Sequence, residues 1–167
     1  MGQVRSIRES DAPAFARIYN HYIRETLVTF EEEEIDDADA LSRIREITSE
    51  HAWYVYESED GRIEGYAYIA PFKSRCSYRY SLELSIYLDK DATGKGIGTQ
   101  LMKAVLAAAQ SGDCHILIGG VALPNDASVR IHEKFGFEKV AHFKEVGRKF
   151  DRWIDVAYWQ KTINPIH

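Results

Sequence analysis

The chain has few of the residues that mark a secreted, metal-binding or membrane protein. Its 167 residues include only two cysteines, Cys76 and Cys114, whose contexts differ, so no disulfide framework is expected. Its six histidines lack the spacing of metal ligands, and we assign no metal. The sequence has no signal peptide and no apolar run near the roughly 20 residues that a membrane span needs. These absences predict a soluble, cytoplasmic protein.

An excess of positive charge is absent as well. The formal net charge is -5, which argues against nucleic acid or an anionic membrane as the main partner but permits a local basic patch. Hydrophobic residues make up 45% and charged residues 28%, as in ordinary soluble globular proteins. The chain has no linker, internal repeat or low-complexity tract. We therefore expect one domain, residues 1–167, large enough to bury its own core.

The standard nucleotide-binding motifs are missing too. The chain contains no GxxxxGK[ST], which excludes a P-loop. Its glycine-rich segment GKGIG, at 94–98, lacks the third, later glycine of the dinucleotide fingerprint and does not lie in an N-terminal βαβ unit. A dinucleotide-binding domain is therefore not expected.

The most informative segment runs from Ser81 to Gln110. Its first part alternates apolar and polar residues with the period of a β-strand, and its last part carries apolar residues at helical spacing. The alternating residues are Leu82, Leu84, Ile86 and Leu88, and the helical ones are Leu101, Met102, Val105, Leu106 and Ala109. A strand therefore leads through a glycine-rich turn directly into a helix.

That turn contains Gly94, Gly96 and Gly98. Glycines let the main chain approach a ligand closely, and the first turn of a helix presents unpaired N–H groups and a partial positive charge. The turn is therefore a candidate phosphate cradle, to which Lys95 adds a point charge. Glycines also serve in ordinary turns, so the motif alone leaves two interpretations open, a phosphate cradle and a plain turn.

The remaining patterns predict an α+β domain, with antiparallel strands first and a βαβ unit later. Strands are expected at 3–8, 53–57, 63–70, 116–121 and 152–160, with a hairpin turn at Asp60-Gly61 and a strand entry at Gly136-Phe137. Helices are expected after a cap at Ser10 or Asp11, around Leu41–Ile47, and after the turn at 124–126. The acidic run Glu31–Glu34 is expected to be a solvated loop.

The GKGIG turn after a strand, followed by Asn125, Ser128 and the pair Gly136-Phe137, resembles the GNAT superfamily of acetyl-CoA-dependent N-acetyltransferases. Further segments are similar to its phosphinothricin N-acetyltransferases and their relatives that act on amino-acid analogues. These segments are NHYI at 20–23, TFE at 29–31, SRCSYRYSLELSIYL at 74–88, LPNDASVRIHEKFGF at 123–137 and DRWIDVAYWQ at 151–160. The resemblance covers roughly Val4 to Gln160. It implies the GNAT fold, a mixed central sheet flanked by helices, with acetyl-CoA as cosubstrate.

Acetyl transfer requires a deprotonated amine, and an α-amino group titrates near 8. A general base is therefore expected, typically worth about 10²–10⁴ in rate. The resemblance assigns this role to Glu83, which by alternation points away from the Leu82 and Leu84 face, and we expect desolvation to raise its pKa. The alternative is a glutamate on a solvent-facing strand. His132 stands where many GNAT enzymes have a tyrosine, and whether it acts as an acid for the leaving thiolate, shares the base role or is structural stays open.

The resemblance implies that the backbone of the glycine turn binds the pyrophosphate of CoA and that Asn125 binds the pantetheine arm. Asn125 is also interpreted as a turn residue after Pro124, and Ser128 as a helix cap. Thr93 departs from the superfamily pattern, which has Arg or Gln there, so we expect one side-chain contact to differ. The implied cofactor-binding residues are Ile86, Tyr87, Leu88, Thr93, Gly94, Lys95, Gly96, Ile97, Gly98, Thr99, Asn125 and Ser128.

The acceptor pocket is expected to be basic. Lys73, Arg75 and Arg79 cluster just before the central strand, and guanidinium groups bind carboxylates and phosphinates as bidentate forks. We expect Arg75 first and Arg79 second to bind the acceptor, although basic loop residues also serve solubility alone. The resemblance adds Phe30 and Tyr78 as pocket walls.

These residues together predict an enzyme that acetylates the α-amine of a small amino-acid analogue such as phosphinothricin, methionine sulfoximine or methionine sulfone. The alternative is an N-acetyltransferase for protein N-termini, polyamines or an antibiotic, although a polyamine enzyme would favour an acidic pocket. A third possibility is a sensor that binds acyl-CoA without catalysis, but the presence of Glu83 and His132 argues against it. Relatives are commonly homodimers, and the aromatic last strand, with Trp153, Tyr158 and Trp159, offers a surface for a second copy.

Overall fold

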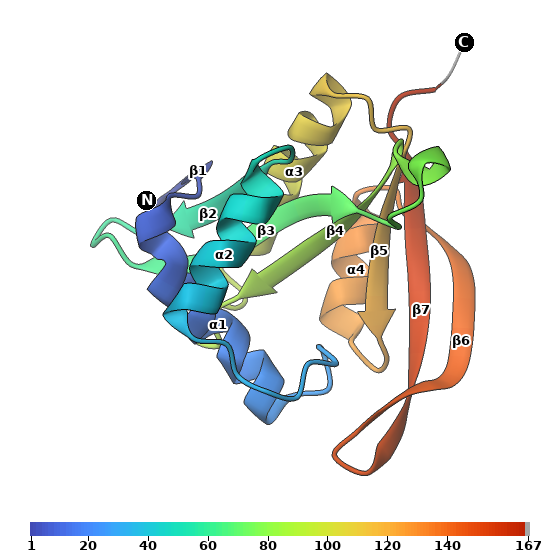
Figure 1. Ribbon diagram of the computed structural model, residues 1–167, viewed down its shortest axis with the longest axis horizontal. Helices are drawn as coiled ribbons and strands as arrows, with labels where there is room; N and C mark the ends of the chain where they lie inside the picture. Colours follow the sequence, from blue (N-terminus) through green and yellow to red (C-terminus); the bar gives the residue numbers. More distant parts are fainter. Residues whose placement is uncertain (166–167) are drawn as a thin grey trace.

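The computed structural model describes residues 1–165 of the chain (Figure 1). Its strands are β1 (Gln3–Ser6), β2 (Trp53–Glu57), β3 (Ile63–Pro71), β4 (Ser81–Leu88), β5 (Ile116–Ala122), β6 (Glu138–Lys149) and β7 (Arg152–Thr162). Its α-helices are α1 (Ala12–Glu25), α2 (Asp37–Thr48), α3 (Ile97–Ser111) and α4 (Asp126–Lys134). Short 3-10 turns at Glu9–Asp11 and Cys76–Tyr78 precede α1 and β4.

Within the described range, the strands form one mixed sheet in the order β1-β2-β3-β4-β5-β7-β6. β4 and β5 run parallel, since α3 carries the chain back between them, and the other neighbouring strands are antiparallel. Helices α1 and α2 cover one face of the sheet, and α3 and α4 cover the other (Figure 1). This arrangement confirms the predicted fold class.

Helix α3 is held to the sheet by a stripe of apolar side chains that recurs at helical spacing. Ile97, Leu101, Met102 and Val105 are at most 1% exposed and pack with Leu82 and other sheet residues in one core cluster. Burying a side chain of this size contributes about 1.5–3 kcal/mol. The strand and the helix predicted on either side of the glycine turn are therefore both confirmed, and the turn between them is fixed at each end.

The parallel pair β4 and β5 separates partway along its length. Only Ser81–Glu83 of β4 pair with Ile116–Ile118 of β5, although both strands continue further. Past Glu83 the two strands diverge, as Figure 1 shows. The divergence leaves the end of β4 without a hydrogen-bonded neighbour on the β5 side and opens a cleft through the sheet.

Helix α1 begins directly after Asp11, as predicted, but two details differ from the structure at the N-terminus. β1 ends at Ser6 rather than at residue 8. Asp11 precedes α1 but makes no side-chain capping bond. Its carboxylate instead accepts two hydrogen bonds from the guanidinium of Arg5 and one from the Arg8 N–H. A bidentate, charged pair of this kind outcompetes a single capping bond.

No helix within residues 1–165 is both long enough and apolar enough to cross a membrane. Over the same range, no three His, Cys, Asp or Glu side chains gather as metal ligands would. Both cysteines are free, Cys76 exposed and Cys114 buried.

Candidate active site

A cavity of about 410 Å³ occupies the cleft between β4 and β5. It brings together both predicted catalytic residues, Glu83 and His132. It also contains seven of the predicted cofactor-binding residues, namely Ile86, Tyr87, Leu88, Thr93, Gly98, Asn125 and Ser128. These side chains come from β4, from the turn after it and from both ends of α4, so the separated strands gather residues that are far apart in the sequence.

The glycine turn forms the end of this cavity where α3 begins. Gly94 and Gly96 have φ angles of 76° and 77°, in the left-handed region that glycine adopts without strain. No heavy atom lies within 4 Å of the position that a Cβ would take at either residue, so the turn faces open space. Gly96 precedes α3 without a side-chain cap, which leaves the first N–H groups of the helix available to a ligand. The geometry is that of an anion cradle.

The turn is anchored by the buried carboxylate of Asp89, directly after β4. Asp89 accepts a hydrogen bond of 3.0 Å from the Asp91 N–H and forms ion pairs with Arg17 of α1 and with Arg62. Burial alone would raise the pKa of Asp89, but the Asp91 N–H and the two guanidinium groups lower it to about 2. The carboxylate is therefore ionised at neutral pH and fixes the start of the turn.

Glu83 lies on β4, opposite the Leu82 and Leu84 face, as the alternation predicted. Burial raises the pKa of its carboxyl group, and the positive charge of Lys73 opposes this shift in part. The expected direction of the shift is confirmed. A partly desolvated carboxylate is a better proton acceptor than a fully hydrated one.

His132 on α4 is 2% exposed. Its Nδ1 atom lies 2.7 Å from the carbonyl oxygen of Ser128, and its Nε2 atom has no hydrogen-bond partner within the described chain. Burial lowers the pKa of this imidazole, and the bond to Ser128 opposes the shift. Because a carbonyl only accepts, Nδ1 carries the proton in the neutral ring, and Nε2 bears a lone pair that is buried against Gly119 of β5.

A second cavity, of about 490 Å³, adjoins the first and shares Glu83 with it. Tyr87, Val28, Gly120 and Ala122 also line both cavities. The remaining walls come from the loop after α1 and from the β6–β7 hairpin: Thr29, Phe30, Phe143, Val146, Val156 and Tyr158. Glu83 therefore stands at the boundary between two cavities, one reaching the glycine turn and one reaching the hairpin.

The loop wall of the second cavity is held in place by Glu31. Its carboxylate accepts two hydrogen bonds from Arg43 of α2 and another from the hydroxyl of Tyr19. The prediction of a solvated acidic loop is therefore wrong for Glu31, which is partly buried in this network, whereas residues 32–34 are exposed. A charge run in the sequence does not reveal which of its members faces an arginine of another helix.

The predicted basic cluster is divided by the structure. Lys73, Arg75 and Tyr78 line a third hollow together with Ser74, and none of these residues lines either of the two cavities that share Glu83. The guanidinium of Arg79 instead donates to the Cys76 carbonyl and lies 4.5 Å from the centre of the Tyr80 ring. Of the basic residues, Lys73 is the one whose charge acts on Glu83.

Five predicted cofactor residues do not line the first cavity: Gly94 and Gly96 of the turn already described, and Lys95, Ile97 and Thr99. The ammonium of Lys95 is 3.6 Å from Glu64, Ile97 is a core residue that is 1% exposed, and the hydroxyl of Thr99 accepts a hydrogen bond from Lys134. Asn125 both lines the cavity and caps α4, since its Oδ1 accepts from the Ser128 N–H. The two interpretations of Asn125 are therefore compatible, and Ser128 is not the cap.

The residues that sequence reasoning missed come mainly from the β6–β7 hairpin. Phe143, Val146 and Val156 belong to strands whose pattern identifies them only as ordinary strand residues. Thr29 and Glu31 flank Phe30 in the TFE segment, which is the one signal that pointed to this loop.

The chain belongs to the GNAT acetyltransferase family, since residues 4–158 match its Acetyltransferase (GNAT) domain. It is an N-acetyltransferase, as its curated relatives are. It is 36% identical to the phosphinothricin N-acetyltransferase of Alcaligenes faecalis, over 96% of this chain and 82% of that protein. It is 29% identical to the L-methionine sulfoximine/L-methionine sulfone acetyltransferase of Salmonella typhimurium, over 96% and 94% of the two chains.

Solved structures match over nearly the whole chain. The YncA protein of Salmonella typhimurium, solved with its cofactor acetyl-CoA, superposes with a TM-score of 0.97 at 27% identity, over 100% of this chain and 96% of that one. A phosphinothricin acetyltransferase from Sinorhizobium meliloti in complex with acetyl-CoA gives a TM-score of 0.94 at 29% identity, over 97% and 88%.

Proposed function

We propose that this enzyme transfers the acetyl group of acetyl-CoA directly to the α-amine of a small amino-acid analogue, such as phosphinothricin, methionine sulfoximine or methionine sulfone. One observation carries the proposal: Glu83 lines both the cavity that reaches the glycine turn and the cavity that reaches the β6–β7 hairpin. A base at this boundary reaches an amine in one cavity while the acyl donor occupies the other. Acetylation of such an analogue would also detoxify it.

The residues of the first cavity fit acetyl-CoA. The open, left-handed glycine turn and the uncapped start of α3 suit the pyrophosphate, and Asn125 has its Nδ2 amide free within the described residues to meet the pantetheine arm. When bound there, acetyl-CoA supplies a thioester carbonyl as the acyl donor. The end of β4, unpaired on the β5 side, offers backbone hydrogen-bonding groups to the same arm.

Glu83 is proposed to act as the general base. Its carboxylate takes a proton from the acceptor's ammonium group, directly or through one water, and so produces the neutral amine that attacks. The raised pKa of Glu83 brings it closer to the pKa of the amine, which favours this transfer.

His132 is proposed to assist as a proton acceptor rather than as an acid. A neutral imidazole with its proton on Nδ1 presents a lone pair at Nε2 and has no second proton to donate. Its burial beside β5 also gives it a packing role.

For the acceptor, we propose that the amine lies at Glu83 and that its carboxylate faces Lys73 and Arg75. Replacing Arg75 by alanine is expected to raise the KM for acidic or zwitterionic acceptors at least fivefold, and for neutral amines much less, because a guanidinium fork binds a carboxylate specifically. Steady-state kinetics on matched acceptors with and without a carboxylate measure this difference. Arg79→Ala is the matched control, since Arg79 is bonded to its own loop. An equal rise in KM for both acceptor types would show that Arg75 is structural.

We also propose that the enzyme is a homodimer. The β6–β7 hairpin exposes an unusual set of large apolar side chains: Val140, Phe143, Val146, Phe150 and Trp153, each at least 52% exposed. Several large apolar side chains exposed on one hairpin are typical of a protein interface. Of the aromatic residues of the last strand, Trp153 is available for such a contact, whereas Trp159 is 2% exposed and belongs to the core.

The function is tested by thiol release from acetyl-CoA in the presence of phosphinothricin, methionine sulfoximine, methionine sulfone, the common amino acids, spermidine and an N-terminal peptide. Release with one or more of the first three supports the proposal. Thiol release only with the peptide or the polyamine would show that the acceptor belongs to a different class. If acetyl-CoA binds but no acceptor causes thiol release, a sensor is favoured over an enzyme.

A further inference from the structure

Lys149, the last residue of β6, is 2% exposed although it carries an ammonium group. Its Nζ atom donates a hydrogen bond of 2.8 Å to the Thr29 carbonyl and a longer one of 3.4 Å to the Tyr22 carbonyl. No ion pair with a carboxylate is formed by Lys149 within residues 1–165. A lysine is rarely buried without a partner, because desolvating the charge is costly.

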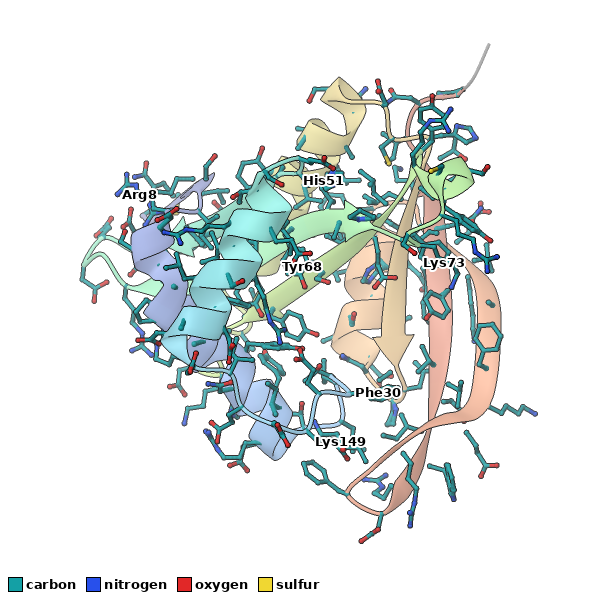
Figure 2. The ribbon with its side chains drawn as sticks, viewed as in Figure 1. Arg8, Phe30, His51, Tyr68, Lys73 and Lys149 are labelled. Atoms are coloured by element: carbon teal, nitrogen blue, oxygen red, sulfur yellow. The ribbon has the colours of Figure 1, made fainter. Side chains whose placement is uncertain are left out.

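The two carbonyls place this ammonium between the two walls of the second cavity. Thr29 lies in the loop after α1, and Lys149 lies at the tip of the hairpin, 120 positions later in the chain. Figure 2 shows Lys149 and Phe30 in the region where this loop approaches the hairpin. The same loop and hairpin supply most of the side chains that line this cavity beyond β4 and β5.

The hairpin also contacts the loop through apolar atoms. Its two-residue turn consists of Phe150 and Asp151, with φ angles of 50° and 56°, the positive values that tight β-hairpin turns adopt. Further along the hairpin, Gly147 lies against Phe30 so closely that a Cβ on Gly147 would come within 2.4 Å of the ring. Two independent contacts, one polar and one apolar, therefore join the hairpin to the loop.

We propose that Lys149 is a positioning residue, whose buried ammonium group holds the Val28–Phe30 loop against the β6–β7 hairpin and so fixes the shape of the acceptor cavity. This inference rests on the proposed function in one respect: with acetyl-CoA in the first cavity, the acceptor amine reaches Glu83 from the second. Lys149 does not line either cavity and is not a catalytic residue.

The test replaces Lys149 by methionine, which keeps the length of the side chain and removes the charge and its donors. The KM for the amine is expected to rise at least fivefold, while the KM for acetyl-CoA stays within twofold, because Val28 is the one residue of this loop that lines the first cavity, whose other walls come from β4, β5, α4 and the glycine turn as well as Tyr22 of α1. Amide hydrogen exchange in the segment 26–32 is expected to accelerate at least fivefold. The Val28 and Glu31 N–H groups there bond only to hydroxyls of the loop itself. Lys144→Met, at an exposed position of the same strand, is the matched control and is expected to change neither quantity.

Unchanged exchange in the loop together with an unchanged KM for the amine would overturn the proposal. A parallel rise in both KM values with a large fall in Tm would also overturn it, since that pattern reports general destabilisation. If Lys149→Met yields no folded protein, Lys149→Gln, which keeps a polar head, replaces it with the same expectations. If the wild-type enzyme acetylates no amine in the panel, the proposed function fails, and the exchange measurement alone decides whether Lys149 holds the loop.

Discussion

Replacing Glu83 by glutamine is expected to lower kcat by about 10²–10⁴-fold, the usual contribution of a general base. The glutamine keeps the size of the side chain and its place between the two cavities, but its amide has no basic site for the proton of the amine. Affinity for acetyl-CoA is expected to stay within about twofold, because the proposed contacts to the cofactor lie mainly at the glycine turn and the start of α3. Single-turnover kinetics and calorimetric titration with acetyl-CoA measure the two quantities separately.

The same variant is expected to be more stable than the wild type at neutral pH. Because burial raises the pKa of Glu83 in the folded state, the folded protein binds more protons than the unfolded chain between the unfolded and folded pKa values. The contribution of Glu83 to stability is therefore lost as pH rises through this window, and a neutral glutamine avoids that loss. The Tm of Glu83→Gln should exceed that of the wild type at pH 7, with the difference vanishing below about pH 4.

Glu138→Gln is the matched control, since Glu138 is an exposed glutamate on a strand and lines neither cavity. It should change neither kcat nor Tm measurably. Full activity in Glu83→Gln would show that another group accepts the proton, and His132 would then be the first candidate.

The glycine-turn unit was predictable because its signals are local. Alternation in β4, the left-handed glycines and the apolar stripe of α3 each depend on residues a few positions apart, and both elements were predicted where the structure has them. The desolvation of Glu83 also followed from its apolar neighbours on the strand.

The acceptor side was not predictable in the same way. Its walls meet across more than 100 positions of the sequence, and neither Phe143 nor Lys149 differs in pattern from an ordinary strand residue.

In the basic cluster, by contrast, residues that are close in the sequence were wrongly expected to share one pocket. Arg75 and Arg79 are neighbours in the sequence, but the short 3-10 turn at Cys76–Tyr78 separates them, so that Arg79 packs on Tyr80 and only Arg75 lines the hollow with Lys73. Proximity along the chain predicted the charge of this region but not which residue faces which cavity.

Replacing Gly119 by alanine is expected to destabilise the enzyme by about 1–3 kcal/mol, the usual cost of overpacking a core. A Cβ on Gly119 of β5 would lie 2.3 Å from Nε2 and 2.6 Å from Cδ2 of the buried His132 ring, so the ring must move or the strand must bend. For a chain of this size the corresponding fall in Tm is about 2–12 °C. Gly112→Ala is the control, because a Cβ there would meet no atom closer than 3.8 Å.

A double-mutant cycle identifies the cause of this cost. In the background His132→Ala the side chain that a Cβ at position 119 would strike is absent, so Gly119→Ala should then cost less than about 0.5 kcal/mol, with a coupling energy of about 1–2 kcal/mol. Equal costs in both backgrounds would mean that the strand, and not the imidazole, resists the change. The kcat of the Gly119→Ala variant tests whether the imidazole takes part in proton transfer. If the lone pair at Nε2 assists proton removal, Gly119→Ala should lower kcat toward the value of His132→Ala, whereas a purely structural histidine would leave kcat unchanged once the protein is folded.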